Sequence, residues 1–137
     1  MTTAGYSGTP LAKKLGIKPG YKISVIHAPN GYFELFSDLP DDLEWIDDPN
    51  IKKDLIHYFS DSKSQLEKDI EQLQDEIEQQ GSIWVSWPKK SSKVETDLDG
   101  NVVRELGLNH GLVDIKVCAV SEIWSGLKFV IPVKDRK

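Results

Sequence analysis

The stretch "YKISVIHA", residues 21–28, decides the fold class. If this stretch is extended, Ile23 and Val25 point to one side, while Ile26 and Ala28 point to the other. A strand with two apolar faces lies inside a sheet that helices cover on both sides, which is typical of parallel sheets. The short run "IWVSW" at 83–87 has the same character. The sequence therefore predicts an α/β protein with a mostly parallel sheet.

Helical patterns flank these strands. In "TPLAKKLGIKPG", residues 9–20, Thr9 is the expected N-cap, Pro10 suits the first helical position and Gly16 ends the helix. Another helix is expected to begin at about Thr96 or Asp97 and to end at Gly107.

The longest helix is expected over residues 61–81. Ser62 and Gln65 fit a capping box, and Gly81 is the expected end. An apolar stripe spaced 4, 3 and 4 runs along this helix and comprises Leu66, Ile70, Leu73 and Ile77. Two alternatives remain open: the stripe packs on the sheet, or it meets a partner helix, because the spacing also describes a coiled-coil seam.

Further strands are expected over residues 43–47, 54–60, 83–87, 111–120 and 126–133. The last two are joined by "SEIWS", which is too short for a crossover helix, so they form an antiparallel hairpin. We therefore expect one α/β domain over residues 1–137, a Rossmann-like sandwich whose mostly parallel sheet ends in a C-terminal antiparallel hairpin. Residues 1–8 are expected to form a flexible N-terminal segment.

Composition limits the classes of partner. Seventeen basic and twenty-two acidic side chains give a net charge of −5, which disfavours bulk nucleic-acid binding. Cys118 is the only cysteine, so an intrachain disulfide is impossible. No apolar stretch reaches the roughly 20 residues needed to span a membrane, and the first ten residues lack a signal peptide's apolar region. We expect a cytoplasmic protein without nucleic-acid or membrane partners.

Five motifs extend over nearly the whole chain: "SGTPLAKKLGIKPG", "SVIHAPNGY", "IWVSWPKKSS", "GLVDIKVCAV" and "WSGLKFV". Together they resemble a family of small bacterial proteins of unknown function. The resemblance implies a bacterial, single-domain protein. It assigns no activity and no catalytic residues.

The entry to the first strand also resembles the approach to the first motif of Rossmann-like methyltransferases, in "LGIKPG" and the strand after it. In those enzymes the strand enters a glycine-rich turn that lets the backbone approach the cofactor. Here the strand enters "HAPNGY", which has one glycine, and Pro29 lacks a backbone N–H. The resemblance therefore implies the fold, and we expect no cofactor.

Established chemical motifs are absent from the sequence. It contains no GxGxxG, no GxxxxGK[ST] and no GxSxG, and "DLDGN" at 97–101 has its glycine at the wrong position for a calcium loop. The histidines are not spaced as metal ligands, so no metal site and no catalytic constellation are predicted. His27 follows the first strand, where it either bonds a backbone carbonyl or serves as a general base.

The densest basic cluster follows "IWVSW". Ligands of open α/β sheets bind beyond the carboxyl ends of the strands, so this loop and "HAPNG" are expected at neighbouring ends. We predict an anion site there with a helix N-terminus just beyond. The candidate residues are Lys89, Lys90, Ser91, Ser92, Lys93, Trp87, His27 and Asn30. The alternative is a solvated loop in which the serines make turn bonds.

Two functions follow from these observations. The first is a module that binds an anionic small molecule or phosphate. The second is an interaction or structural protein that self-associates through the C-terminal edge strand or the 62–80 helix and has no ligand. The oligomeric state is expected to be a monomer or a homodimer.

Overall fold

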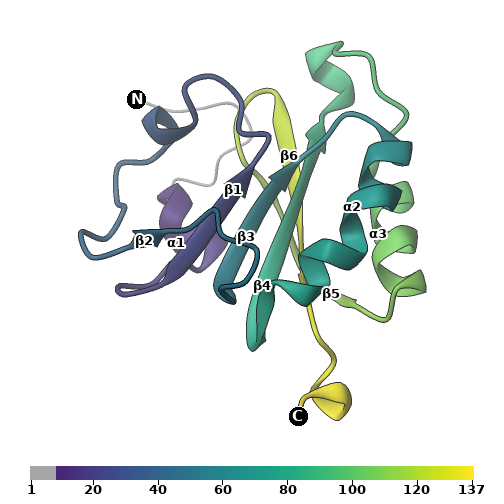
Figure 1. Cartoon of the computed structure of the whole chain (residues 1–137). Coiled ribbons are helices and arrows are strands. Elements are labelled where there is room, and N and C mark those ends of the chain that lie inside the picture. The colour runs from purple at the N-terminus through teal and green to yellow at the C-terminus, as the bar shows by residue number, and fades with distance from the viewer. Residues whose placement is uncertain (1–8) are drawn as a thin grey trace.

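The computed structural model describes residues 9–137 (Figure 1). The segment 1–8, which we expect to be flexible, lies outside the described residues. The elements in chain order are α1 (Leu11–Leu15), β1 (Lys22–Ile26), η1 (Tyr32–Leu35), β2 (Glu44–Trp45), β3 (Lys53–Phe59), α2 (Lys63–Asp75), β4 (Ile77–Pro88), η2 (Lys90–Ser92), α3 (Gly100–Asn109), β5 (Val113–Ala119), β6 (Trp124–Val130) and η3 (Val133–Asp135).

The six strands form one sheet in the order β2-β1-β3-β4-β6-β5. The pairs β1–β2, β1–β3 and β3–β4 are parallel, whereas β6 is antiparallel to both β4 and β5. Because β6 lies between β4 and β5, these two strands run in the same direction. The prediction of a mostly parallel α/β sheet with a C-terminal antiparallel hairpin is confirmed.

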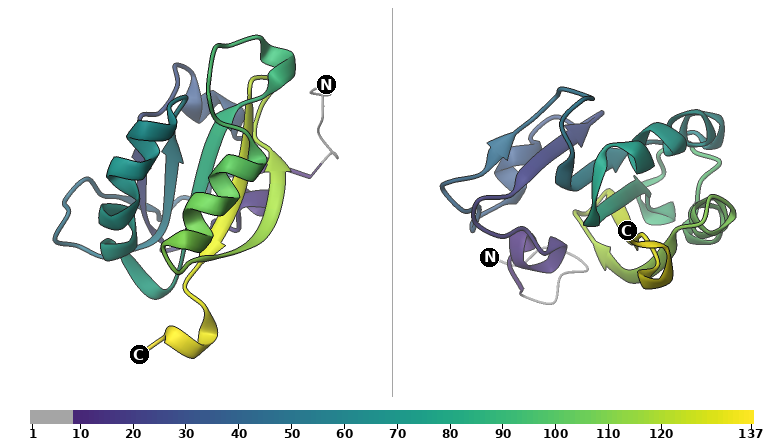
Figure 2. Two further views of the ribbon diagram at one scale, coloured as in Figure 1. Left: turned by 90° about the vertical axis from the view of Figure 1, so that its right-hand side faces the viewer. Right: turned by 60° about the horizontal axis from the view of Figure 1, so that its bottom comes forward.

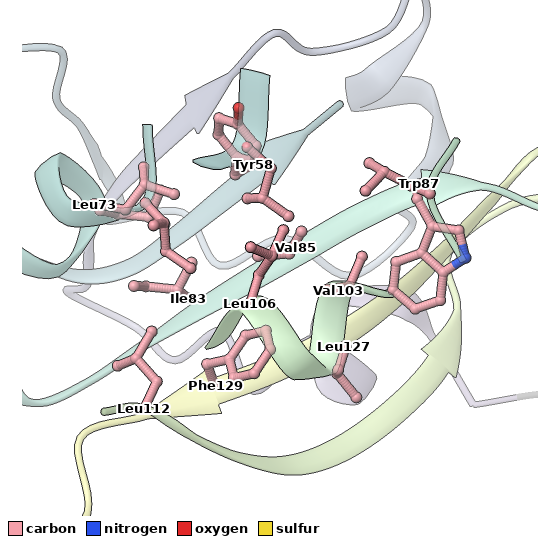
Figure 3. Packing of buried hydrophobic residues seen from close by; sticks show 14 of the residues in the cluster. Tyr58, Leu73, Ile83, Val85, Trp87, Val103, Leu106, Leu112, Leu127 and Phe129 are labelled. Carbon is pink, nitrogen blue, oxygen red and sulfur yellow. The ribbon is translucent and has the colours of Figure 1, made fainter. Parts of the chain in front are cut away.

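Helices cover both faces of the sheet, as the apolar pattern of β1 requires. Helices α2 and α3 lie on one face, and α1 lies on the other (Figures 1 and 2). Leu66, Ile70 and Leu73 of α2 are at most 2% exposed and pack in the cluster beneath α2 and α3 (Figure 3). The apolar stripe therefore packs on the sheet. None of the described helices is long and apolar enough to cross a membrane.

The 61–81 helix is shorter than the sequence predicts. Ser62 caps it by accepting a hydrogen bond from the backbone N–H of Gln65, as expected, but the helix ends at Asp75. Residues from Ile77 onward belong to β4, because Ile77 pairs with Lys53 before a register shift. Gly81 lies in that shifted segment, where a Cβ would meet the carbonyl oxygens of Lys53 and Asp54 at 3.0 Å. Gly81 therefore allows β3 and β4 to approach closely, and it does not end the helix.

The other two helix boundaries also differ. Helix α1 has Pro10 as its N-cap, without a side-chain cap, although Gly16 ends it in a left-handed conformation as expected. Helix α3 begins at Gly100 behind an Asp99 side-chain cap and continues through Gly107. A Cβ on Gly107 would lie 2.1 Å from the Phe129 ring, so this glycine permits close packing of the helix on β6.

Candidate functional site

The carboxyl ends of β1 and β3 are the position where an open α/β sheet offers a ligand site. From β1 the chain goes to β2 on one side, and β3 then pairs with β1 on the other, so the strand order reverses at β1. Ligands of such sheets bind in the crevice beyond the carboxyl ends at this reversal. Two hollows formed by described residues include residues of the turn that follows β1.

The first hollow, which we call the central hollow, has a volume of about 300 Å³. It lies beyond the ends of β1 and β3, and its lining residues are His27, Phe59, Ser60, Asp61, Ser62, Gln65 and Trp124. Trp124 of β6 packs edge-on against Phe59 with the ring centroids 5.0 Å apart. The hollow thus combines an aromatic wall with hydroxyl, carboxylate and imidazole groups.

His27 holds the turn after β1 in an unusual conformation. Its φ of 59° lies in the left-handed region, which favours glycine. A residue with a side chain, such as histidine, adopts this conformation at an energetic cost. The ring compensates by bonding, through Nδ1, the carbonyl oxygen of Phe59 at 3.1 Å. A carbonyl only accepts, so Nδ1 of His27 carries a hydrogen and donates it. His27 therefore both bonds a carbonyl and lines the hollow.

Hydrogen bonds fix most of the polar groups around the central hollow. The Ser60 hydroxyl donates to the carbonyl oxygen of Ser62 and accepts from its N–H, both at 3.1 Å. The Gln65 amide donates to Asp69, which also accepts from the Tyr58 hydroxyl at 2.6 Å. Burial, and secondly the Asp69 bond, raise the pKa of Tyr58. The carboxylate of Asp61 is exposed and makes no hydrogen bond or ion pair within residues 9–137.

The second hollow, the edge hollow, has a volume of about 360 Å³ and lies over β1 and β2. It is lined by Ile23, Val25, Ala28, Phe33, Trp45, Ile46 and Asp47. Phe33 and Trp45 meet edge-on at 5.0 Å, and 56% and 42% of these side chains are exposed. The Asp47 carboxylate follows β2 and has no partner among the described residues.

A buried polar chain anchors the loop that carries Phe33. The Tyr32 hydroxyl bonds Nδ1 of His57 at 3.0 Å, and Nε2 of His57 bonds the Ser86 hydroxyl at 2.8 Å. All three side chains are buried, and burial lowers the pKa of His57 to about 3. The chain therefore connects η1 to β3 and β4 through an uncharged imidazole.

This burial predicts acid sensitivity. His57 is neutral in the folded protein, whereas the unfolded chain takes up a proton below an ordinary pKa of about 6.5. The folded-state pKa is the lower one, so stability is complete above pH 6.5 and falls as the pH drops. The free energy of unfolding is expected to fall by about 1.4 kcal/mol per pH unit between pH 6 and 5.

Urea unfolding at several pH values measures this dependence of stability on pH. His57→Gln should lose the slope and His110→Gln should keep it; equal slopes in both variants would contradict the assignment.

The structure separates the sequence-predicted site into two parts. His27 and Asn30 lie in the turn after β1, whereas residues 87–93 line neither hollow. Trp87 is 7% exposed and packs in the core beneath α3, close to Gly100 (Figure 3). The expected helix N-terminus is also distant along the chain, because α3 begins only at Gly100.

The loop at 89–93 forms the turn bonds of the alternative interpretation. The Ser92 hydroxyl donates to the carbonyl oxygen of Lys89 at 2.6 Å and accepts from the N–H of Val94 at 3.2 Å. Ser91 and Lys90 are exposed in η2, and Lys93 follows in a left-handed conformation.

Comparison with solved structures identifies the fold. The chain is similar to the ribosomal protein L11 methylase of Lactobacillus delbrueckii subsp. bulgaricus, with a TM-score of 0.56 and 12% identity over 88% of this chain and 74% of that one. It is also similar to the magnesium protoporphyrin IX methyltransferase of Synechocystis PCC 6803 with bound SAH, with a TM-score of 0.60 and 11% identity over 85% and 76%.

A third similar structure is the N-methyltransferase NodS of Bradyrhizobium japonicum WM9 in complex with S-adenosyl-L-homocysteine. Its TM-score is 0.58, and its identity is 13% over 89% of this chain and 83% of that one. No family model and no curated protein match the sequence. At these identities the likeness shows the fold alone.

These neighbours overturn two predictions. The expected function as an anion-binding or self-associating module is wrong, because the solved structures that share the fold include methyltransferases in complex with SAH. The expectation of an anionic small molecule as the only partner is wrong for the same reason.

Sequence analysis missed two residues of the hollows, Asp47 and Asp61. The position of Asp47, twenty residues beyond His27, was an available signal, because an acidic residue at this distance holds the ribose in dinucleotide-binding folds. The chain has the methyltransferase-like Rossmann fold.

Proposed function

We propose that this chain is a small methyltransferase-type domain that binds S-adenosylmethionine across the carboxyl ends of β1, β2 and β3. The observation that carries the proposal is the unpartnered Asp47 carboxylate beyond β2, in a hollow walled by Phe33 and Trp45. The SAH and SAM complexes among proteins of this fold support the choice of ligand. The proposal replaces the expectation of no cofactor.

The residues of the edge hollow fit the nucleoside half of this ligand. A carboxylate accepts hydrogen bonds from ribose hydroxyls, and aromatic rings offer faces for stacking a base. Asp47 would therefore hold the ribose, and Phe33 with Trp45 would hold the adenine. In the central hollow the free carboxylate of Asp61 suits the amino group of the methionine half.

The turn after β1 departs from a glycine-rich cradle. His27 occupies the left-handed position with a side chain, and Pro29 offers no backbone N–H. The ligand would therefore depend more on side chains, Asp47 above all, than on the backbone of this turn.

When bound, S-adenosylmethionine supplies an activated methyl group for transfer to a nucleophile. The chain's own contribution would be His27, which lines the central hollow and whose Nε2 would be available to accept a proton because Nδ1 bonds the Phe59 carbonyl. Trp124 of β6 and Phe59 of β3 would limit the access of water to the central hollow.

Calorimetric titration with S-adenosylmethionine and with S-adenosylhomocysteine tests the proposal. Wild type should bind both, and Asp47→Asn should raise the dissociation constant about 10- to 100-fold, because a hydrogen bond to a charged group contributes roughly 1.5–3 kcal/mol. Glu44→Gln removes the same charge from an exposed site on β2 and should leave the affinity unchanged. No binding to wild type, or equal losses in both variants, would refute the proposal.

We also propose that residues 1–137 act as one domain in the cytoplasm. Every described strand belongs to a single sheet, which supports one domain. The free thiol of Cys118, the only cysteine, is compatible with a reducing compartment.

A further inference from the structure

A groove lined by lysines lies between α1 and β5, away from both hollows. Its volume is about 440 Å³, and its lining residues are Thr9, Lys13, Lys14, Lys116, Val117, Cys118 and Ala119. We call it the lysine groove. Helix α1 and the β5–β6 hairpin are far apart in sequence but adjacent in space (Figure 2, right).

Backbone carbonyls hold the lysine ammonium groups in place. Lys14 Nζ donates to the carbonyl oxygen of Ala119 at 3.0 Å, and Lys116 Nζ donates to that of Lys14 at 2.9 Å. Lys128 of β6 places its Nζ beside Gly16, where it would be 3.2 Å from an added Cβ. Of these contacts, the one that Lys116 makes is to a carbonyl in the last turn of α1, where a cation is favourable. A carbonyl bonds an ammonium group without neutralising its charge.

None of the described residues that line the lysine groove carries a carboxylate. The carboxylate that contacts α1 is Asp38, and its two oxygens accept the backbone N–H groups of Ala12 and Lys13 at 3.1 Å. Burial, and then the charges of Lys116 and Lys18, lower the pKa of Lys128. A chain with a net charge of −5 therefore concentrates positive charge on one surface.

We propose that the lysine groove binds the phosphodiester backbone of a single-stranded nucleic acid. Phosphate contacts need only fixed cations, and positively charged grooves that follow the backbone are the common feature of single-strand binding. A protein partner would need aromatic or large apolar anchors, whereas among the described lining residues Val117 is the one large apolar side chain that is exposed. None of the described residues that line the groove is aromatic. Contacts to phosphates carry no sequence information, so the binding is independent of base sequence.

The proposal corrects what composition alone suggests. A net negative charge disfavours bulk binding, but it does not exclude a local cluster whose charges act within a Debye length of about 10 Å. Because the net charge of the chain is −5, we expect moderate affinity that falls steeply with salt.

Fluorescence anisotropy with labelled single-stranded RNA and with DNA of the same sequence, between about 50 and 200 mM KCl, tests the proposal. Lys13→Gln/Lys116→Gln should reduce the affinity about 25-fold near 0.1 M salt and the salt slope by about 1.4, since each single-strand phosphate contact contributes roughly 0.7. Lys90→Gln/Lys93→Gln makes the same change in net charge in the 89–93 loop and should alter the affinity less than about twofold.

Three results would overturn the proposal. They are failure of wild type to bind either strand at the lowest salt, equal losses in the two double variants, and tighter binding of polyglutamate than of RNA. The last result would indicate an acidic protein partner. Unchanged thermal midpoints of both double variants show that the comparison is made between folded proteins. The outcome is independent of whether S-adenosylmethionine binds.

Discussion

Lys53→Met is expected to reduce the free energy of unfolding by about 3–5 kcal/mol, because it leaves the Glu76 carboxylate buried without its cation. Lys53 is fully buried and Glu76 is 8% exposed, and Lys53 Nζ bonds the Glu76 carboxylate and, at 2.8 Å, the carbonyl oxygen of Asp48. Gln72 donates to the other Glu76 oxygen at 2.7 Å. The pair thus joins the starts of β3 and β4 to the end of α2.

Urea denaturation of wild type and variant measures this loss. The double variant Lys53→Met/Glu76→Leu should recover much of it, since an apolar pair of similar size needs no charge compensation. Lys68→Met, on an exposed position of α2, should change stability by less than about 0.5 kcal/mol. A single-variant loss as small as that of Lys68→Met would show that the ion pair is not buried as described.

Leu73→Asp is expected to unfold the protein almost completely. Leu73 is 2% exposed and packs against the sheet, and an isolated carboxylate in such surroundings costs several kcal/mol or more. The total stability of a domain this size is roughly 5–15 kcal/mol. Thermal melting followed by circular dichroism, together with the solution mass, measures the outcome.

Leu108→Asp is the matched control, because Leu108 lies on α3 with 44% of its side chain exposed. It should lower stability by less than about 1 kcal/mol. If Leu73→Asp instead kept its thermal midpoint and changed the oligomeric state, the apolar stripe of α2 would face a partner chain.

The proposed ligand site and the lysine groove are formed by different elements of the fold. The site depends on the carboxyl ends of β1, β2 and β3, whereas the groove depends on α1 and the β5–β6 hairpin. Failure of one proposal therefore leaves the other open to test.

The sequence by itself determined the class of fold and most of its elements. The two apolar faces of "YKISVIHA" required helices on both sides of the sheet, and the short "SEIWS" connection required an antiparallel hairpin. Both signals are local, since side-chain periodicity and connection length are properties of contiguous residues. The Ser62 cap of α2 was predictable for the same reason.

Only the tertiary structure decided which polar residues meet. His27 bonds the carbonyl of Phe59, Tyr32 connects to Ser86 through His57, and Lys53 pairs with Glu76. Each of these contacts joins separate segments of the chain. Sequence density favoured the lysines at 89–93, yet that loop bonds itself, and the lysines that gather come from α1, β5 and β6. Spacing along a chain reports neighbours within one element, whereas a site depends on strand register and order, which non-local pairing sets.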